Sequence, residues 1–424
     1  MNDISEPKRK TKKTPVKKGT AIKVKNTKKH GRFLFVLCMC LISIILGSIL
    51  VYFLTSDTKF SEADNNIISK NIVKSDTQTS DSVSTIPTTI IPVLPPLDTA
   101  AYDKKLNEIA NNPVIIAPPV TNDTTSSTVT NKTSTKNVAK KIVPKPKPVL
   151  PNIWPVKTAY PNAGALLPFN RIIAFYGNFY STKMGILGQY PSDEVIKKLN
   201  AVVAQWNAAD PSTPVIPAID YIAVSAQGSA GSDGKYRLRM PFDQIDKALA
   251  MANQVHGVLF LDIQVGQSNL ETEIPPLEKY LAMPNVELAI DPEFAMHNGI
   301  KPGRYIGTID AKDVNWTANY LASLVKANNI PPKILVIHRF TENSVTNYKQ
   351  ITPLPEVQIV MDMDGWGAEP NKIAIYNEII YPEPIQFTGF KLFYKNDLLP
   401  PSTGLLSPSQ LLKLRPQPSY IQYQ

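Results

Sequence analysis

Residues 168–424 alternate short apolar runs with helix-like segments, and this alternation constrains the fold more than any other feature of the chain. Near-continuous apolar runs separated by helices are typical of a parallel sheet covered by helices on both sides. Eight such runs are present, at 171–177, 215–226, 258–264, 286–294, 305–310, 333–340, 357–365 and 387–395. Their number and the length of the region predict a (β/α)8 TIM-like barrel, with a doubly wound parallel α/β sheet as the alternative.

Polar side chains recur where these runs end. Because side chains alternate across a strand, residues two positions apart share one face. Three same-face pairs result: Asp262 with Gln264, Asp291 with Glu293, and Asp362 with Asp364. In a barrel all three pairs would point inward at the carboxyl-terminal mouth, where the active sites of this fold lie.

A single acidic residue at a strand end is usually a turn former or a helix cap, and Asp310 fits that role. Three polar pairs on three strands are harder to explain in this way. Crowded carboxylates repel each other and are costly to desolvate, so they indicate proton transfer or cation binding. We therefore expect Glu293 or a neighbour to hold a proton near neutral pH.

Four further residues are candidates for substrate binding. His338 lies in the sixth run, as either a buried structural histidine or a polar partner of the carboxylates. Lys391 points inward only if Phe387 and Gly389 do, and the opposite phase would select Phe390 and Tyr394. Tyr176 lies near the end of the first run, and Trp366 follows Asp364 closely enough to cover the mouth and stack on a sugar ring.

Common catalytic motifs are missing from the sequence. It contains no nucleophilic serine elbow, P-loop, G-x-G-x-x-G or H-E-x-x-H. Its two cysteines, Cys38 and Cys40, both lie in one apolar run near the N-terminus, which excludes a disulfide framework or a cysteine zinc site elsewhere. We expect no cofactor and assign no metal ligand, although a metal-dependent variant using Asp262, Asp291, Asp362 and His338 stays open.

Residues 33–54 form a run of 22 residues without a charge, which is long enough to cross a bilayer core of about 30 Å. The basic segment 1–32 precedes it, so the positive-inside rule predicts a retained single-pass signal-anchor with a cytoplasmic N-terminus. No small residue precedes Cys38 or Cys40, as a lipoprotein signal requires. The expected partner of 33–54 is the lipid bilayer of the cell membrane, and the expected location of the C-terminal domain is extracytoplasmic.

Residues 55–167 are rich in Ser, Thr and Pro, and no glycine occurs from 55 to 163. Such a composition buries too little apolar surface to offset chain entropy, and proline without glycine keeps it extended. We therefore predict four segments: a basic tail at 1–32, a transmembrane helix at 33–54, a disordered stalk at 55–167, and the barrel domain at 168–424.

The net charge of +10 suggests nucleic-acid binding only at first sight. Twelve Lys and Arg against two acids lie in residues 1–32, so the rest of the chain has no basic excess with which to neutralise phosphates. We expect no nucleic-acid partner.

Several strings resemble those of an uncharacterised bacterial family of secreted or membrane-anchored proteins, often labelled lipoproteins. They include FYGNFYSTKMGILGQYPSDE, FLDIQVGQS, ELAIDPEFAM, PPKILVIHRFTEN, IVMDMDGWG and FTGFKLFYKND. The barrel also resembles retaining glycoside hydrolases, which place an acid/base on the fourth strand and a nucleophile on the seventh. By the order of the runs, Glu293 and either Asp362 or Asp364 hold those places.

Two classes of function follow. The first is a membrane-anchored hydrolase of cell-wall or extracellular glycans, with Glu293 as general acid, Asp362 or Asp364 as nucleophile or base, and Asp262 and Trp366 positioning the sugar. The alternative is a non-catalytic binding or structural protein of the cell envelope. An open mouth favours the first class, and carboxylates tied to Lys or Arg favour the second.

Overall fold

Eight parallel strands close into a barrel in the computed structural model, which describes residues 95–113, 152–297 and 299–424. In barrel order the strands are β1 (Arg171–Gly177), β2 (Val215–Ala226), β4 (Val258–Ile263), β5 (Val286–Ile290), β7 (Lys333–Arg339), β9 (Val357–Met363), β10 (Phe387–Leu392) and β11 (Tyr420–Tyr423). Strand β1 pairs with both β2 and β11, which closes the sheet. The predicted TIM-like barrel is confirmed, and the open doubly wound sheet is excluded.

One predicted barrel strand is wrong, and one strand of the barrel was not predicted. The run at 305–310 gives only β6 (Ile309–Asp310), which pairs with β8 (Val345–Thr346) outside the barrel. Gly307 in this run packs against the backbone of Ala295, and a Cβ at Gly307 would lie 2.4 Å from the Ala295 carbonyl oxygen. The eighth barrel strand is β11, which is four residues long and therefore too short to stand out in the sequence.

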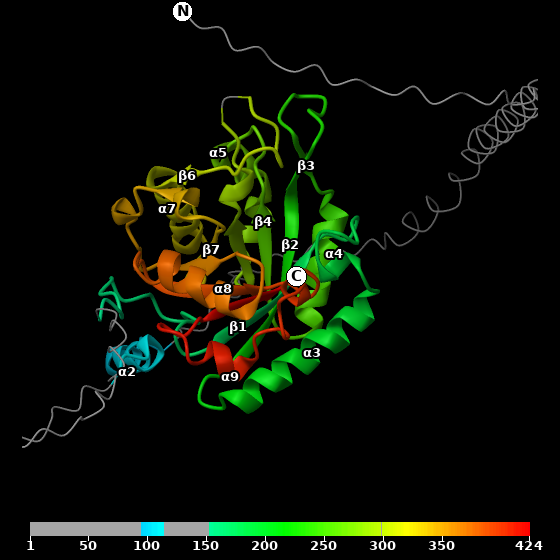
Figure 1. Cartoon of the computed structure of the whole chain (residues 1–424). Coiled ribbons are helices and arrows are strands. Elements are labelled where there is room, and N and C mark those ends of the chain that lie inside the picture. Colours follow the sequence, from blue (N-terminus) through cyan, green and yellow to red (C-terminus); the bar gives the residue numbers. More distant parts are fainter. Residues whose placement is uncertain (1–94, 114–151, 298) are drawn as a thin grey trace, which may run out of the picture. The chain divides into compact units, whose positions relative to one another are not determined.

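Helices cover the outside of the barrel (Figure 1). They are α3 (Ser192–Ala209), α4 (Phe242–Gln254), α5 (Leu270–Glu273), α6 (Glu278–Leu281), α7 (Ala311–Asn328), α8 (Glu369–Ile375) and α9 (Pro408–Leu411). The long ones bury one apolar face, for example Val195, Leu199 and Trp206 of α3. Asp310 caps α7 by accepting a hydrogen bond from the Lys312 amide, as predicted. The short strand β3 (Arg237–Arg239) pairs antiparallel with β2.

Alternate strand residues face the inside and the outside of the barrel. Outward residues such as Ile173 and Phe390 pack with the helices in the larger apolar cluster. Inward residues such as Ile172 and Phe387 form a second, inner cluster at the amino-terminal ends of the strands. Further along the same strands the inward residues become polar, so the barrel has an apolar base and a polar mouth.

The predicted stalk is wrong for part of its length. Helix α2 (Thr99–Ala110) buries Tyr102 and Ile109 in the inner cluster at the base of the barrel. The amide of Gln417 donates to the Ile109 carbonyl oxygen at 2.7 Å. The indole of Trp154 donates to the Tyr381 carbonyl oxygen at 3.0 Å. The domain therefore includes residues before 168, because these few apolar side chains close the barrel even though the segment around them is polar.

The predicted basic tail and the predicted span at 33–54 lie outside the described residues. Within the described ranges, no helix is both long and apolar enough to cross a membrane.

Candidate active site at the mouth of the barrel

A cavity of about 400 Å³ opens at the carboxyl-terminal ends of the strands. Seven of the ten residues predicted for the site line it: Tyr176, Gln264, Asp291, Glu293, Asp364, Trp366 and Lys391. They come from the ends of β1, β4, β5, β9 and β10 and from the turns that follow these strands. The barrel therefore brings together residues that are more than 200 positions apart in the sequence.

Three carboxylates crowd this mouth. Asp291, Glu293 and Asp364 each place an oxygen within 4.8 Å of the others. Asp291 and Glu293 were predicted to share one face of a strand, and this is wrong. Strand β5 ends at Ile290, and Asp291 caps a 3-10 turn at Pro292–Phe294. That turn still directs both side chains into the cavity.

Burial and mutual repulsion hold protons on this cluster. The pKa of Glu293 is raised to about 7, first by burial and then by the charge of Asp364. The pKa of Asp291 is raised well above its usual value, mainly by burial, with Asp262 and Asp364 adding repulsion. The expectation of a proton on Glu293 or a neighbour near neutral pH is therefore confirmed in direction.

Lys391 supplies a cation in the mouth. Its Nζ lies 3.0 Å from Asp364 Oδ1 and 4.2 Å from the centre of the Tyr176 ring. Burial alone would lower the pKa of Lys391, but Asp364 and its acidic neighbours raise it, so the ammonium stays charged. Lys391 points into the barrel, because Phe387 of the same strand, β10, packs inside the barrel and Phe390 packs outside it.

Gln264 joins two other residues of the mouth. Its Nε2 donates to Tyr176 Oη at 3.2 Å and to Asp291 Oδ2 at 3.3 Å. Its Oε1 accepts from the Ala226 amide at 3.1 Å. An amide held at three points orients Asp291 and Tyr176 relative to each other.

The other three predicted site residues lie in a layer beneath the cavity. Asp262, His338 and Asp362 are at most 1% exposed and do not line the cavity. His338 Nε2 lies 3.0 Å from Asp262 Oδ2, and Nδ1 lies 3.1 Å from Asp362 Oδ2. Burial lowers the pKa of His338, but these two carboxylates raise it well above its usual value. Asp362 is therefore a partner of His338, and of the two predicted nucleophiles only Asp364 reaches the cavity.

Gly389 makes room for this layer. It pairs with Asp362 across the sheet, and a Cβ at Gly389 would lie 2.5 Å from Asp362 Oδ1. We expect Gly389→Ala to lower the free energy of unfolding by about 1–3 kcal/mol, because Asp362 is locked by His338 and cannot move away. Urea unfolding followed by circular dichroism measures this change. Gly228→Ala is the control, since no atom lies within 4 Å of a Cβ there, and equal stability of the two variants would contradict the prediction.

Sequence reasoning missed several residues of the barrel interior. Asp220 in the middle of β2 is fully buried, and its Oδ2 accepts from Tyr420 Oη at 2.6 Å and from Gln422 Nε2 at 2.7 Å. A lone Asp inside the apolar run at 215–226 was the available signal. Lys183, Phe294, Phe340 and Phe393 also line the cavity.

The strand order changes the comparison with retaining glycoside hydrolases. Glu293 follows β5, the fourth barrel strand, as predicted. Asp362 and Asp364 belong to the end of β9, which is the sixth barrel strand and not the seventh. The seventh strand, β10, carries Lys391 instead.

No protein-family model matches the chain, and no curated protein matches its sequence. Among solved structures, a "Cellulase Cel5C_n" aligns with 53% of this chain at 13% identity and a TM-score of 0.31. The alignment spans 65% of that cellulase, which is less than two thirds of its length. Thermotoga maritima Cel5A in complex with cellobiose aligns with 60% of this chain and 89% of its own, at 10% identity and a TM-score of 0.34.

The mannanase man26 of Bacillus subtilis aligns with 60% of this chain and 79% of its own, at 9% identity and a TM-score of 0.32. The barrel of this chain is established by its own strand pairing. Its function has to be inferred from the residues at the mouth.

Proposed function

We propose that the mouth of this barrel hydrolyses glycosidic bonds in cell-wall or extracellular glycans. The observation that carries the proposal is the cluster of Asp291, Glu293 and Asp364, whose oxygens lie within 4.8 Å of one another in an open cavity. Glycoside hydrolysis needs one protonated and one ionised carboxyl group on either side of the scissile bond. A Glu293 with a pKa of about 7 beside an ion-paired Asp364 meets this requirement.

In this proposal Glu293 protonates the leaving oxygen and Asp364 attacks the anomeric carbon. Carboxyl groups about 5–5.5 Å apart support the retaining mechanism, whereas inverting enzymes need about 6.5–9.5 Å to admit a water molecule. One oxygen of Glu293 and one of Asp364 lie within 4.8 Å of each other, and on this proximity we base the proposal of retention. Glu293 then acts as base towards the water that releases the sugar from Asp364.

Lys391 and Trp366 have supporting roles. The ammonium of Lys391 forms an ion pair with Asp364, and part of this contact would have to break as the carboxylate attacks. Trp366 is 51% exposed while it lines the cavity, so its ring is available to stack on a sugar. Asp262 does not position the sugar in this proposal, because it is completely buried beneath the cavity.

The Lys391–Asp364 ion pair favours a second candidate, a non-catalytic glycan-binding barrel of the cell envelope. A nucleophile held at 3.0 Å by a cation is less reactive than a free carboxylate. The two candidates share the substrate class and differ in turnover.

One assay separates them. The full-length chain, purified in detergent, is incubated with a panel of soluble and insoluble glycans while new reducing ends are measured. Hydrolysis with retained anomeric configuration by NMR supports the first candidate. Binding by pull-down without new reducing ends supports the second, and neither binding nor hydrolysis contradicts both.

We further propose that residues 33–54 anchor the barrel outside the cytoplasm. The charge-free run and the basic residues before it support this orientation. Protease added to intact cells is expected to remove an epitope at the C-terminus and to spare one at the N-terminus, as read by immunoblot. Protection of the C-terminal epitope until the cells are lysed would contradict the orientation.

A further inference from the structure

The layer beneath the mouth contains three carboxyl groups and one imidazole. Asp220, Asp262 and Asp362 surround His338, and all four side chains are at most 1% exposed. One imidazolium balances one of three carboxylates. Buried carboxylates without compensation are too costly to persist, so protons or a bound cation must supply the remaining charge.

Unpaired acceptor atoms mark where that charge is needed. Asp220 Oδ1, Asp262 Oδ1, Asp362 Oδ1 and Gln422 Oε1 are all buried and have no hydrogen-bond partner among the described residues. Gln422 is next to Asp220, since its Nε2 donates to Asp220 Oδ2 at 2.7 Å. Buried acceptors nearly always have a partner in folded proteins, so four in one layer point to a missing positively charged ligand.

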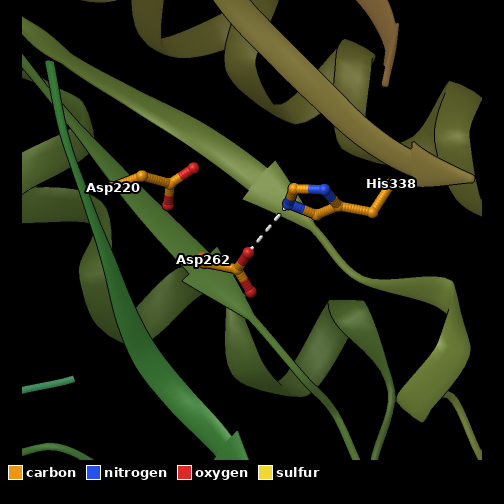
Figure 2. Close-up of side chains that lie close together, drawn as sticks. All are labelled: Asp220, Asp262 and His338. Atoms are coloured by element: carbon orange, nitrogen blue, oxygen red, sulfur yellow. Dashed lines mark hydrogen bonds and ion pairs between the residues drawn. The ribbon is translucent and has the colours of Figure 1, made fainter. Parts of the chain in front are cut away.

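The donor atoms are arranged as in a metal site. Asp220, Asp262 and His338 each place one ligand atom within 4.8 Å of the others, and Figure 2 shows the three side chains converging. His338 Nδ1 contacts Asp362 Oδ2 at 3.1 Å, which directs the other ring nitrogen, Nε2, towards Asp262. Metal-binding histidines almost always donate their second ring N–H to a carboxylate or carbonyl in this way.

Asp220 is oriented in a similar manner. Its Oδ2 accepts hydrogen bonds from Tyr420 Oη and Gln422 Nε2, at 2.6 and 2.7 Å, which leaves Oδ1 without a partner. Hydrogen-bonded carboxylates of this kind are typical of metal ligands held by an outer shell of residues.

We propose that the barrel binds one divalent transition-metal ion through His338 Nε2, Asp262 and Asp220, beneath the glycan cavity. The ion would replace the hydrogen bond between His338 and Asp262. One imidazole with carboxylate oxygens suits Zn²⁺, Fe²⁺ or Mn²⁺, whereas Ca²⁺ and Mg²⁺ prefer oxygen ligands alone. All three residues are completely or almost completely buried, so the ion would stabilise the barrel and would not touch a substrate. The site is independent of the proposed glycan hydrolysis.

Metal content and metal binding test this proposal. The full-length chain is purified in detergent, stripped with a chelator and titrated with Zn²⁺, and bound metal is measured by mass spectrometry. We expect one equivalent of Zn²⁺ that excess Ca²⁺ or Mg²⁺ does not displace. Co²⁺ should give visible absorption bands typical of low coordination number, and this measurement on the unchanged chain needs no variant.

Isosteric variants locate the ion. Asp262→Asn and Asp220→Asn should each weaken Zn²⁺ binding by at least tenfold, and Asp362→Asn, which changes only the partner of His338, by about 10–100-fold. Glu293→Gln is the matched control, because it removes a carboxylate from the other acidic cluster and should leave Zn²⁺ binding unchanged. The absence of a tightly bound equivalent would overturn the proposal in favour of protons, and loss of binding in Glu293→Gln alone would place the ion in the mouth instead.

Discussion

Glu293→Gln is expected to abolish glycan hydrolysis while the melting temperature of the domain stays equal or rises. Glutamine keeps the shape of glutamic acid but cannot donate the proton that the leaving oxygen needs. Loss of a general acid typically lowers the rate by about 10²–10⁴-fold. Glu293 also suffers burial and the repulsion of Asp364, and both penalties fall when its charge is removed.

Hydrolysis rate and thermal unfolding are measured on the same preparations. Glu271→Gln, on the exposed side of α5, is the control and should change neither quantity. If Glu293→Gln instead destabilises the domain by about 0.5–3 kcal/mol and hydrolysis survives, Glu293 has a structural role and the proposed mechanism is wrong.

The pH dependence gives an independent check on the same residue. The pKa of Glu293 is about 7 in the folded chain, against an ordinary value of 4.5. Between these values the folded state holds a proton that the unfolded state has released, so stability is greatest at the acidic end and falls as pH rises towards 7. Hydrolysis should decline above about pH 7, and Glu293→Gln should remove its share of the stability change.

Tyr102→Ala is expected to be among the most destabilising single substitutions in the chain. Tyr102 is 2% exposed at the base of the barrel, where it packs in the same cluster as Ile172 and Phe387. Removing a buried aromatic side chain of this size typically costs about 3–5 kcal/mol, because the barrel cannot collapse into the space. Urea unfolding of the full-length chain measures the loss.

Truncations extend this test to the whole segment. A chain starting at residue 95 should keep the stability of the full-length domain, and a chain starting at residue 168 should lose most of it. Tyr305→Ala is the matched point control, since Tyr305 is 66% exposed and its removal should change stability by less than about 0.5 kcal/mol. Equal stability of the two truncated chains would mean that α2 does not contribute to the fold.

The inward direction of some strand-end residues follows from sequence alternation. Gln264 and Asp364 line the cavity as the two-residue spacing from Asp262 and Asp362 predicts, because side chains alternate across a pleated strand. The spacing left two phases open for Lys391, and only the packing of Phe387 inside the barrel and Phe390 outside it decided between them. The capping role of Asp310 is likewise local, since it depends on the backbone of the next few residues.

The height of each residue inside the barrel does not follow from the sequence. Asp362 and Asp364 share one strand face, yet Asp362 is sealed beneath the cavity against His338 while Asp364 lines it. Strand tilt and stagger around the closed sheet set these heights, and they depend on pairing between strands that are distant in sequence. For the same reason Asp220 could not be recognised as a neighbour of Asp262 and His338.

The sequence by itself determined the fold class and the polar character of one end of the barrel, because hydrophobic periodicity and strand-end composition are local signals. Only the tertiary structure decided that β11 completes the barrel, that α2 covers its base, and which carboxylates meet. A four-residue strand and one helix in a polar segment carry little periodicity of their own, and they are stabilised by contacts with strands far away in the chain.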